Sequence, residues 1–169
     1  MAKKYKLTDE TINVDGRTLH RIEALKDFGV VEKGDKGGFV EKESNLSQHG
    51  ICWVYDNAMV YDNAKVCTNV IVCDDARVYG YAIGLGHAVV CGNAEVYGGT
   101  IISENVRVFG NARIYGNALV YANAVVCGDA EVYDNARVHG NAIVYDNAKV
   151  YGNAEVCNDE RVYGNTEVC

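Results

Sequence analysis

The chain has 169 residues, a formal net charge of −7 and no Pro, but 18 Gly, 12 Tyr and 7 Cys. Its length suits a single domain, and no apolar run approaches the roughly 20 residues that cross a bilayer. The first residues, Met-Ala-Lys-Lys-Tyr-Lys, lack the apolar core of a signal peptide, and an odd number of cysteines in such a chain indicates reduced thiols. We therefore expect a cytoplasmic protein with no membrane contact.

The negative charge is confined to residues 51–169, which hold seven Lys or Arg against fourteen Asp or Glu, whereas residues 1–50 are neutral. Proteins that bind nucleic acids rely on Lys and Arg to neutralise phosphates. We therefore expect no nucleic-acid partner. Solubility explains the acidic balance better than mimicry of a nucleic acid.

Residues 1–36 carry no repeat and are predicted to form a cap. Residues 11–14, the dipeptide Asp15-Gly16 and residues 17–22 are typical of a β-hairpin with a type I′ turn. Such a hairpin would cover the open end of the repeats that follow, where unpaired strand edges invite aggregation. A separate ligand-binding domain is the alternative, but 36 residues are few for an independent core.

From Val54 to Val168 the chain repeats the six-residue unit V-Y-[GD]-N-A-x without insertion or deletion. Every sixth position is Val or Ile, except at Gly84, and a small residue, usually Ala, follows four places later. Strand side chains alternate between two sides, so this small residue and the next Val or Ile point inward, while x and Tyr point outward. Gly or Asp followed by Asn tolerates the positive φ angles of a corner, and stacked Asn corners can hydrogen-bond along the rod.

This pattern resembles that of the hexapeptide-repeat family, aliphatic-x-x-x-small-x. The resemblance implies an all-β fold, a left-handed parallel β-helix of triangular section with three hexads per coil and about seven coils over residues 37–169. The handedness comes from the resemblance alone, since most parallel crossovers are right-handed. Between Leu46 and Val54 the hexad spacing is exceeded by two residues, which predicts a bulge within residues 47–51.

Two segments resemble one branch of that family more specifically. They are Gly-Gly-Phe-Val-Glu-Lys-Glu-Ser-Asn-Leu at residues 37–46 and Cys-Trp-Val-Tyr at residues 52–55, and they are similar to segments of YdcK-like bacterial and phage proteins. Members of this branch are often labelled acyltransferases by fold alone.

The outward side chains sort onto three faces, because residues 18 apart become neighbours on rungs that stack ~4.8 Å apart. The first face has a Tyr at every rung, beside a column of charges that alternates in sign. We interpret it as a solvated surface stabilised by its own contacts, and the alternative is an aromatic strip on which a ligand or partner stacks. Its Tyr ladder consists of Tyr61, Tyr79, Tyr97, Tyr115, Tyr133 and Tyr151, and its charged column of Arg77, Glu95, Arg113, Glu131, Lys149 and Glu167.

The second face is apolar in the middle and polar at both ends, whereas the third face is mostly apolar along its length. Left in water, the third face would be a contiguous apolar patch of roughly several hundred Å², larger than soluble monomers usually expose. We therefore expect a partner subunit to bury it, in a homodimer or homotrimer, with Phe109 as the central anchor. The predicted interface comprises Ile71, Cys73, Val89, Cys91, Arg107, Phe109, Val125, Cys127, Ile143 and Tyr145.

His87 is the candidate catalytic residue, because enzymes of the resembled family usually use a His near a subunit interface as the general base of acyl transfer. It lies in the one hexad with Gly at the aliphatic position, Gly84, and Tyr81 replaces Asn one hexad earlier. These changes could open a pocket with His87 as base. The interpretation we prefer is a corner His that stands in for Asn.

No metal or resident cofactor is predicted. Zinc sites in the carbonic-anhydrase-like branch of the family need three His in close register, whereas His87 and His139 are 52 positions apart. The cysteines lack C-x-x-C spacing. Cys73 and Cys91 stack on adjacent rungs, close enough for a disulfide under oxidation.

The sequence favours a non-catalytic, oligomeric interaction or structural protein, for which a phage-type inhibitor of a host protein is one specific form. The regular coils leave few loops for an active site. An acyl-CoA-dependent acyltransferase, with acyl-CoA as co-substrate, is the first alternative. A sponge for a small molecule or nucleotide held between subunits is the second. The fold alone says little about activity, because one fold can host many unrelated functions.

Overall fold

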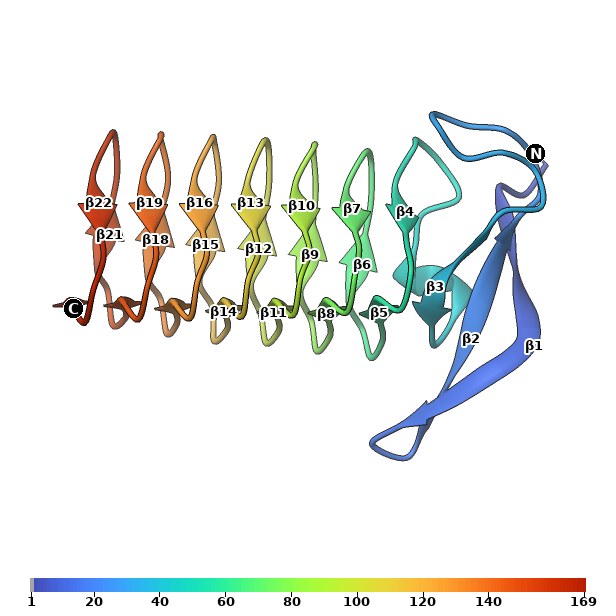
Figure 1. The fold of residues 1–169 in the computed structure, drawn as a ribbon, viewed down its shortest axis with the longest axis horizontal. Helices are drawn as coiled ribbons and strands as arrows, with labels where there is room; N and C mark the ends of the chain where they lie inside the picture. The colour runs from blue at the N-terminus through green and yellow to red at the C-terminus, as the bar shows by residue number, and fades with distance from the viewer. Residues whose placement is uncertain (1) are drawn as a thin grey trace.

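The computed structural model describes residues 2–169; Met1, the first residue of the predicted cap, lies outside them. The chain forms a rod of parallel coils with an antiparallel hairpin across its N-terminal end (Figure 1). A single turn of 3-10 helix, η1 (Glu43–Asn45), lies in the first coil. The predicted all-β class, with about seven turns and an N-terminal hairpin, is confirmed.

Three sheets run along the rod, one for each predicted face. The first sheet orders β1 (Tyr5–Val14), β2 (Arg17–Ala24), β3 (Lys36–Val40), β5 (Met59–Val60), β8 (Arg77–Val78), β11 (Glu95–Val96), β14 (Arg113–Ile114), β17 (Glu131–Val132), β20 (Lys149–Val150) and β23 (Glu167–Val168). The second face is the sheet of β6 (Lys65–Val66), β9 (Ile83–Gly84), β12 (Ile101–Ile102), β15 (Leu119–Val120), β18 (Arg137–Val138) and β21 (Glu155–Val156). The third face is the sheet of β4 (Trp53–Val54), β7 (Ile71–Val72), β10 (Val89–Val90), β13 (Arg107–Val108), β16 (Val125–Val126), β19 (Ile143–Val144) and β22 (Arg161–Val162).

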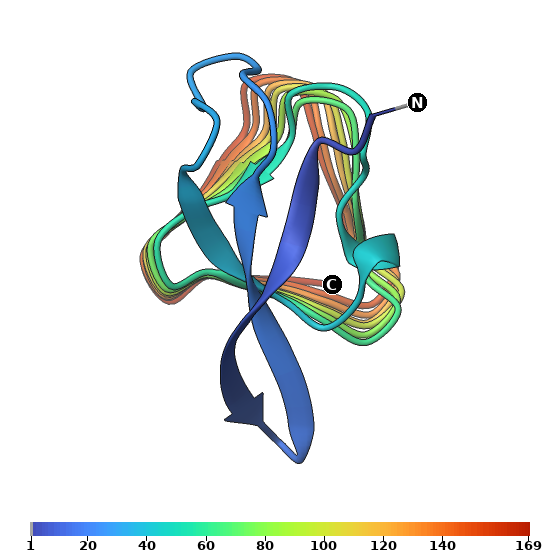
Figure 2. The same cartoon turned by 90° about the vertical axis from the view of Figure 1, so that its right-hand side faces the viewer.

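Each strand of the repeats pairs in parallel with the equivalent strands of the coils before and after it. Val89, for example, lies between Ile71 and Arg107. Viewed from the N-terminal end, the chain passes from β3 to η1 and then to β4 counter-clockwise as it recedes, so the winding is left-handed (Figure 2). The triangular coil and its handedness are as the resemblance implied.

The core is a narrow stack of the inward residues. Each rung contributes Val or Ile from the strands and mostly Ala from the position after each corner, and nearly all of these are fully buried. The third hexad position has φ between 53° and 70° wherever it carries Asp or Gly in the repeats. This left-handed conformation turns the chain, and Gly and Asp adopt it at low cost. The predicted amide ladder is present at the corners: Asn93 donates to Asn111 at 3.2 Å and Asn111 to Asp129 at 2.9 Å.

The hairpin is longer than the sequence indicated. It spans β1 and β2 rather than residues 11–22, because Tyr5, Ile22 and Ala24 are buried against the rod and hold the additional residues in the sheet. Its turn has positive φ at both Asp15 (50°) and Gly16 (81°), as a type I′ turn requires. Because β2 pairs with β3, the hairpin extends the first sheet and covers the end of the rod (Figure 2).

Trp53 closes the N-terminal end of the core. The indole is 1% exposed and meets the rings of Tyr5 and Phe28 edge-on, with centroids 6.1 and 5.2 Å away. The ammonium group of Lys4 is also buried there and donates to the carbonyl of Cys52 at 2.8 Å. Burial lowers the pKa of Lys4.

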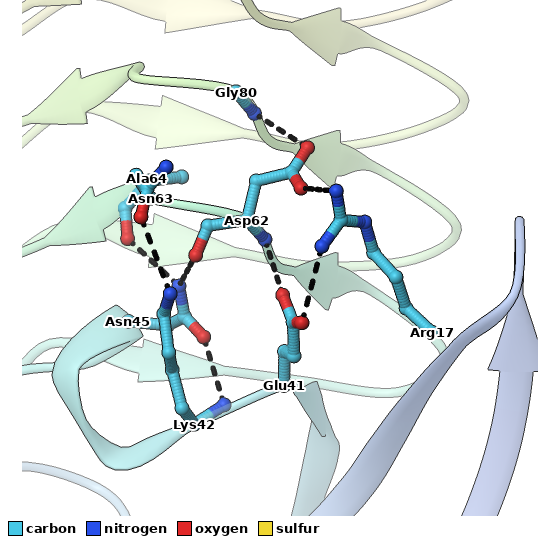
Figure 3. A network of polar contacts seen from close by, with 8 residues as sticks. All are labelled: Arg17, Glu41, Lys42, Asn45, Asp62, Asn63, Ala64 and Gly80. Carbon is cyan, nitrogen blue, oxygen red and sulfur yellow. Dashed lines mark hydrogen bonds and ion pairs between the residues drawn. The ribbon is translucent and has the colours of Figure 1, made fainter.

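A polar network fastens the hairpin to the first coils (Figure 3). Arg17, next to the hairpin turn, pairs with Glu41 and with Asp62, and Glu41 accepts from the backbone N–H of Asp62 at 2.7 Å. Buried Asn45 donates to the carbonyls of Asp62 and Ala64 at 3.1 and 3.0 Å. The cap is therefore held by ion pairs on its outer side and by aromatic packing within.

Candidate functional surfaces

His87 lies at an exposed corner rather than in a pocket. Its Nε2 is 3.5 Å from the Asn69 amide on the preceding rung, so the ring occupies the place of an Asn in the corner ladder. The backbone supports the same interpretation, since His87 N–H donates to the Glu104 carbonyl at 2.7 Å as a regular rung contact.

Gly84 leaves little space in the core. A β-carbon placed on Gly84 would lie 3.3 Å from Cγ1 of Val70 and 3.8 Å from Cγ1 of Ile102. Val70 is itself an exception, because it stands where most hexads have Ala. The small residue at 84 and the larger one at 70 conserve volume, and core substitutions of that kind are the ones best tolerated.

One shallow cavity of about 200 Å³ lies at the corner between the third and first faces. Asn111, Arg113, Asp129 and Glu131 line it, so it lies away from His87. Asn111 and Asp129 are already hydrogen-bonded to each other. The lining is polar and open to solvent, without an apolar floor to hold an acyl chain.

The first face forms a stacked aromatic ladder. Successive Tyr rings from 61 to 151 have centroids 4.8–5.1 Å apart and planes within 7°. The hydroxyls of Tyr79 and Tyr115 donate to Glu95 and Glu131 on the next rungs at 2.9 and 2.8 Å. Burial, and then these hydrogen bonds, raise the pKa of both phenols. The hairpin covers the start of the ladder, where Tyr61 is only 3% exposed.

The third face has the register that the hexad spacing predicted. Its outward residues form two columns, in which Arg107 and Phe109 are exposed and the remaining predicted interface residues are half-buried. The cap reaches this face at β4, where Phe28 packs on Trp53, but lies far from β16 and β19 (Figure 1). The structure holds a single chain, so the predicted interface stays a prediction.

One group of possible metal ligands occurs within residues 2–169. The sulfurs of Cys73 and Cys91 and a carboxylate oxygen of Asp74 lie within 4.8 Å of one another. Both thiols are free, and burial, followed by the neighbouring Cys91 and Asp74, raises the pKa of Cys73 to about 12. The group offers three ligands, whereas structural zinc sites use four. His139 is elsewhere, stacked on Tyr121 with its Nε2 2.7 Å from Glu155.

The contacts that sequence reasoning missed lie in the non-repeating part of the chain. In the sequence Lys4 looks like an exposed terminal charge, and its partner Cys52 is 48 residues away. Asn45 looks like a loop residue, although it satisfies two backbone carbonyls. No periodicity relates these residues to their partners. The two additional residues between Leu46 and Val54 were the signal in the sequence that pointed to this region.

The coils form a parallel β-solenoid, and part of it is similar to the YdcK repeat. A family model described as "YdcK Beta solenoid repeat" matches residues 112–128 and 130–146. The matched stretches are consecutive coils of regular hexads, which confirms the resemblance over these repeats.

A comparison with curated proteins also finds similarity to a YdcK protein. The chain is similar to the "Uncharacterized acetyltransferase YdcK" of Escherichia coli (strain K12), with 37% identity over 62 residues. The similarity covers 32% of this chain and 19% of that protein, so it spans about a fifth of the relative. Within residues 2–169, no helix has the length and apolar character that crossing a membrane requires.

Proposed function

We propose that the chain is a non-catalytic interaction module whose third face binds a second copy of the chain. The observation that carries this proposal is the apolar strip along that face, which neither the cap nor a loop covers beyond its first rung (Figure 1). Phe109 is 38% exposed at its centre. A strip this long is costly to leave in water and is typical of association surfaces.

The first face is less suited to association. Its phenol hydroxyls and carboxylates satisfy each other along the rod, and Lys149 lies 3.8 Å from Glu131. A partner docking there would compete with these contacts and desolvate charges. The third face carries only Arg107 and Arg161 as charged outward residues.

Two lysines introduced by substitution at the far end of the third face should prevent association. We expect wild-type protein to be oligomeric at micromolar concentration by light scattering, and Val125→Lys/Ile143→Lys to be monomeric, because an unpaired charge is costly to bury. Ser103→Lys on the second face is the matched control and should keep the wild-type mass. A monomeric wild type, or a double variant with unchanged mass, would contradict the proposal.

Acyl transfer is the second candidate function, and the name of the Escherichia coli relative is the observation that favours it. The exposed corner position of His87 and the packing of Val70 beside Gly84 weigh against it. Inhibition of a partner protein is a narrower form of the interaction proposal, to which the third face would also be suited.

Acetyl-CoA should not raise the melting temperature of the protein, since only a ligand that binds the native state stabilises it and we expect no acetyl-CoA site. His87→Asn should likewise leave the melting temperature and the oligomeric state unchanged, because Asn is the usual corner residue. Differential scanning fluorimetry and light scattering measure both. A clear upward shift with acetyl-CoA that His87→Asn abolishes would contradict this expectation and favour the acyltransferase instead.

A further inference from the structure

We infer that two copies pack with their third faces together and their rods parallel, around a two-fold axis that runs along the rods. This inference rests on the proposed function and specifies the geometry of its interface. It follows from how size and charge are arranged on the face.

The third face consists of two columns that run along the rod. The first column is Ile71, Val89, Arg107, Val125, Ile143 and Arg161, as the strand register shows. The second column, two residues later on each rung, is Cys73, Cys91, Phe109, Cys127, Tyr145 and Tyr163. The columns differ in kind: the first holds branched aliphatics and both Arg, and the second holds Cys and aromatic rings.

Two identical faces whose rods are aligned along their length can meet around a two-fold axis in only two ways, and in both the contact is self-complementary. An axis along the rod sets the first column against the second column of the other copy, rung for rung. An axis across the rod makes the rods antiparallel and sets each column against its own kind. The arrangement of side chains distinguishes these two possibilities.

The parallel arrangement gives each Arg an aromatic partner. Arg107 would face Phe109 of the second copy, and Arg161 would face Tyr163 of the second copy. A guanidinium group over an aromatic ring is a favourable pair that lets the charge be buried. On the other rungs a branched side chain meets a small Cys, as Val89 would meet Cys91, apart from the rung where Ile143 meets Tyr145.

The antiparallel arrangement brings like charges together. Its register that best matches aliphatic residues, Val89 with Val125, is centred on Arg107 and sets the two copies of Arg107 against each other. The corner residues on either side of the face, which form the rim of the contact, also bring like charges together. Glu104 would face Glu104 of the second copy, and Asp74 would face Asp146 of the second copy. Like charges at a desolvated contact disfavour association.

The rim of the parallel arrangement avoids these conflicts. The exposed corner residue Glu104 would lie opposite Asn111 of the second copy, and Asp74 opposite Asn69. A two-fold axis along the rod also allows no sliding between rungs, so the register is fixed by symmetry.

Complementary charges introduced in separate copies test the axis. Val89→Lys and Cys91→Glu should each raise the dimer dissociation constant by about 100-fold, since each would bury an unpaired charge. Mixed in equal amounts, the two variants should form a heterodimer, because the lysine introduced in one copy would face the glutamate introduced in the other. Native mass spectrometry identifies the mixed species by its mass, and circular dichroism checks that each variant folds.

The matched control is Val89→Lys mixed with Val125→Glu, which should remain monomeric. The parallel axis is wrong if the control mixture forms a heterodimer, whether alone or together with the first mixture. It is also wrong if neither mixture forms a heterodimer although the wild type is dimeric. In each of these cases the proposed association stands. A trimeric wild type also overturns the two-fold axis alone. A monomeric wild type overturns both.

Discussion

Trp53→Ala should lower the free energy of unfolding by about 3–5 kcal/mol, the usual range for removing a large buried aromatic side chain. The indole fills the space between Tyr5, Phe28 and the first coil, and its loss leaves a cavity where the cap meets the core. The cap should loosen as well and expose strand edges at the end of the rod. Urea denaturation followed by circular dichroism measures the first effect.

Tyr81→Ala provides the control for that experiment. Tyr81 is also a large aromatic residue, but it is 69% exposed at a corner, so we expect a change within about 0.5 kcal/mol. Similar losses for Trp53→Ala and Tyr81→Ala would show that Trp53 does not connect the cap to the core.

Ala118→Leu should destabilise the protein by about 1–3 kcal/mol through overpacking. Ala118 is completely buried at an inward position, stacked between the coils of Thr100 and Ala136. The narrow triangular section leaves no room for three more carbon atoms without moving the backbone of a rung. Urea unfolding of the variant is the measurement.

Lys65→Leu introduces the same side chain at an outward position and should change stability by no more than about 0.5 kcal/mol. An unchanged midpoint for Ala118→Leu would mean that the narrow section can expand.

The repeating part of the fold could be predicted at the level of single contacts. Once three hexads make a coil, the pairing of Val89 with Ile71 and Arg107 and the stacking of the Tyr ladder follow from spacing alone. The cap could be predicted only in kind. The contacts of Lys4, Asn45 and Trp53 join segments that no period relates.

The candidate sites divide in the same way. The columns of the third face and the corner position of His87 followed from the period, but the packing around Gly84 did not. The space left by Gly84 is filled by Val70, which comes from a preceding corner rather than from the equivalent position of a neighbouring coil. Gly84 lacks a side chain where the repeat has Val or Ile, and Val70 is larger than the usual Ala. Taken together, these two exceptions would have predicted that Val70 fills the space at Gly84, so that no pocket forms.

The alternating charges of the first face double the length of the chemical repeat. The backbone returns to the same position on every coil, whereas a Tyr hydroxyl meets a Glu only on every second coil, at Tyr79, Tyr115 and Tyr151. Removing the one coil that carries Glu95 would set Arg77 beside Arg113 without disturbing the core. Removing two coils would keep both the core and the alternation. A rod of this kind can therefore change its length without electrostatic cost only in steps of two coils.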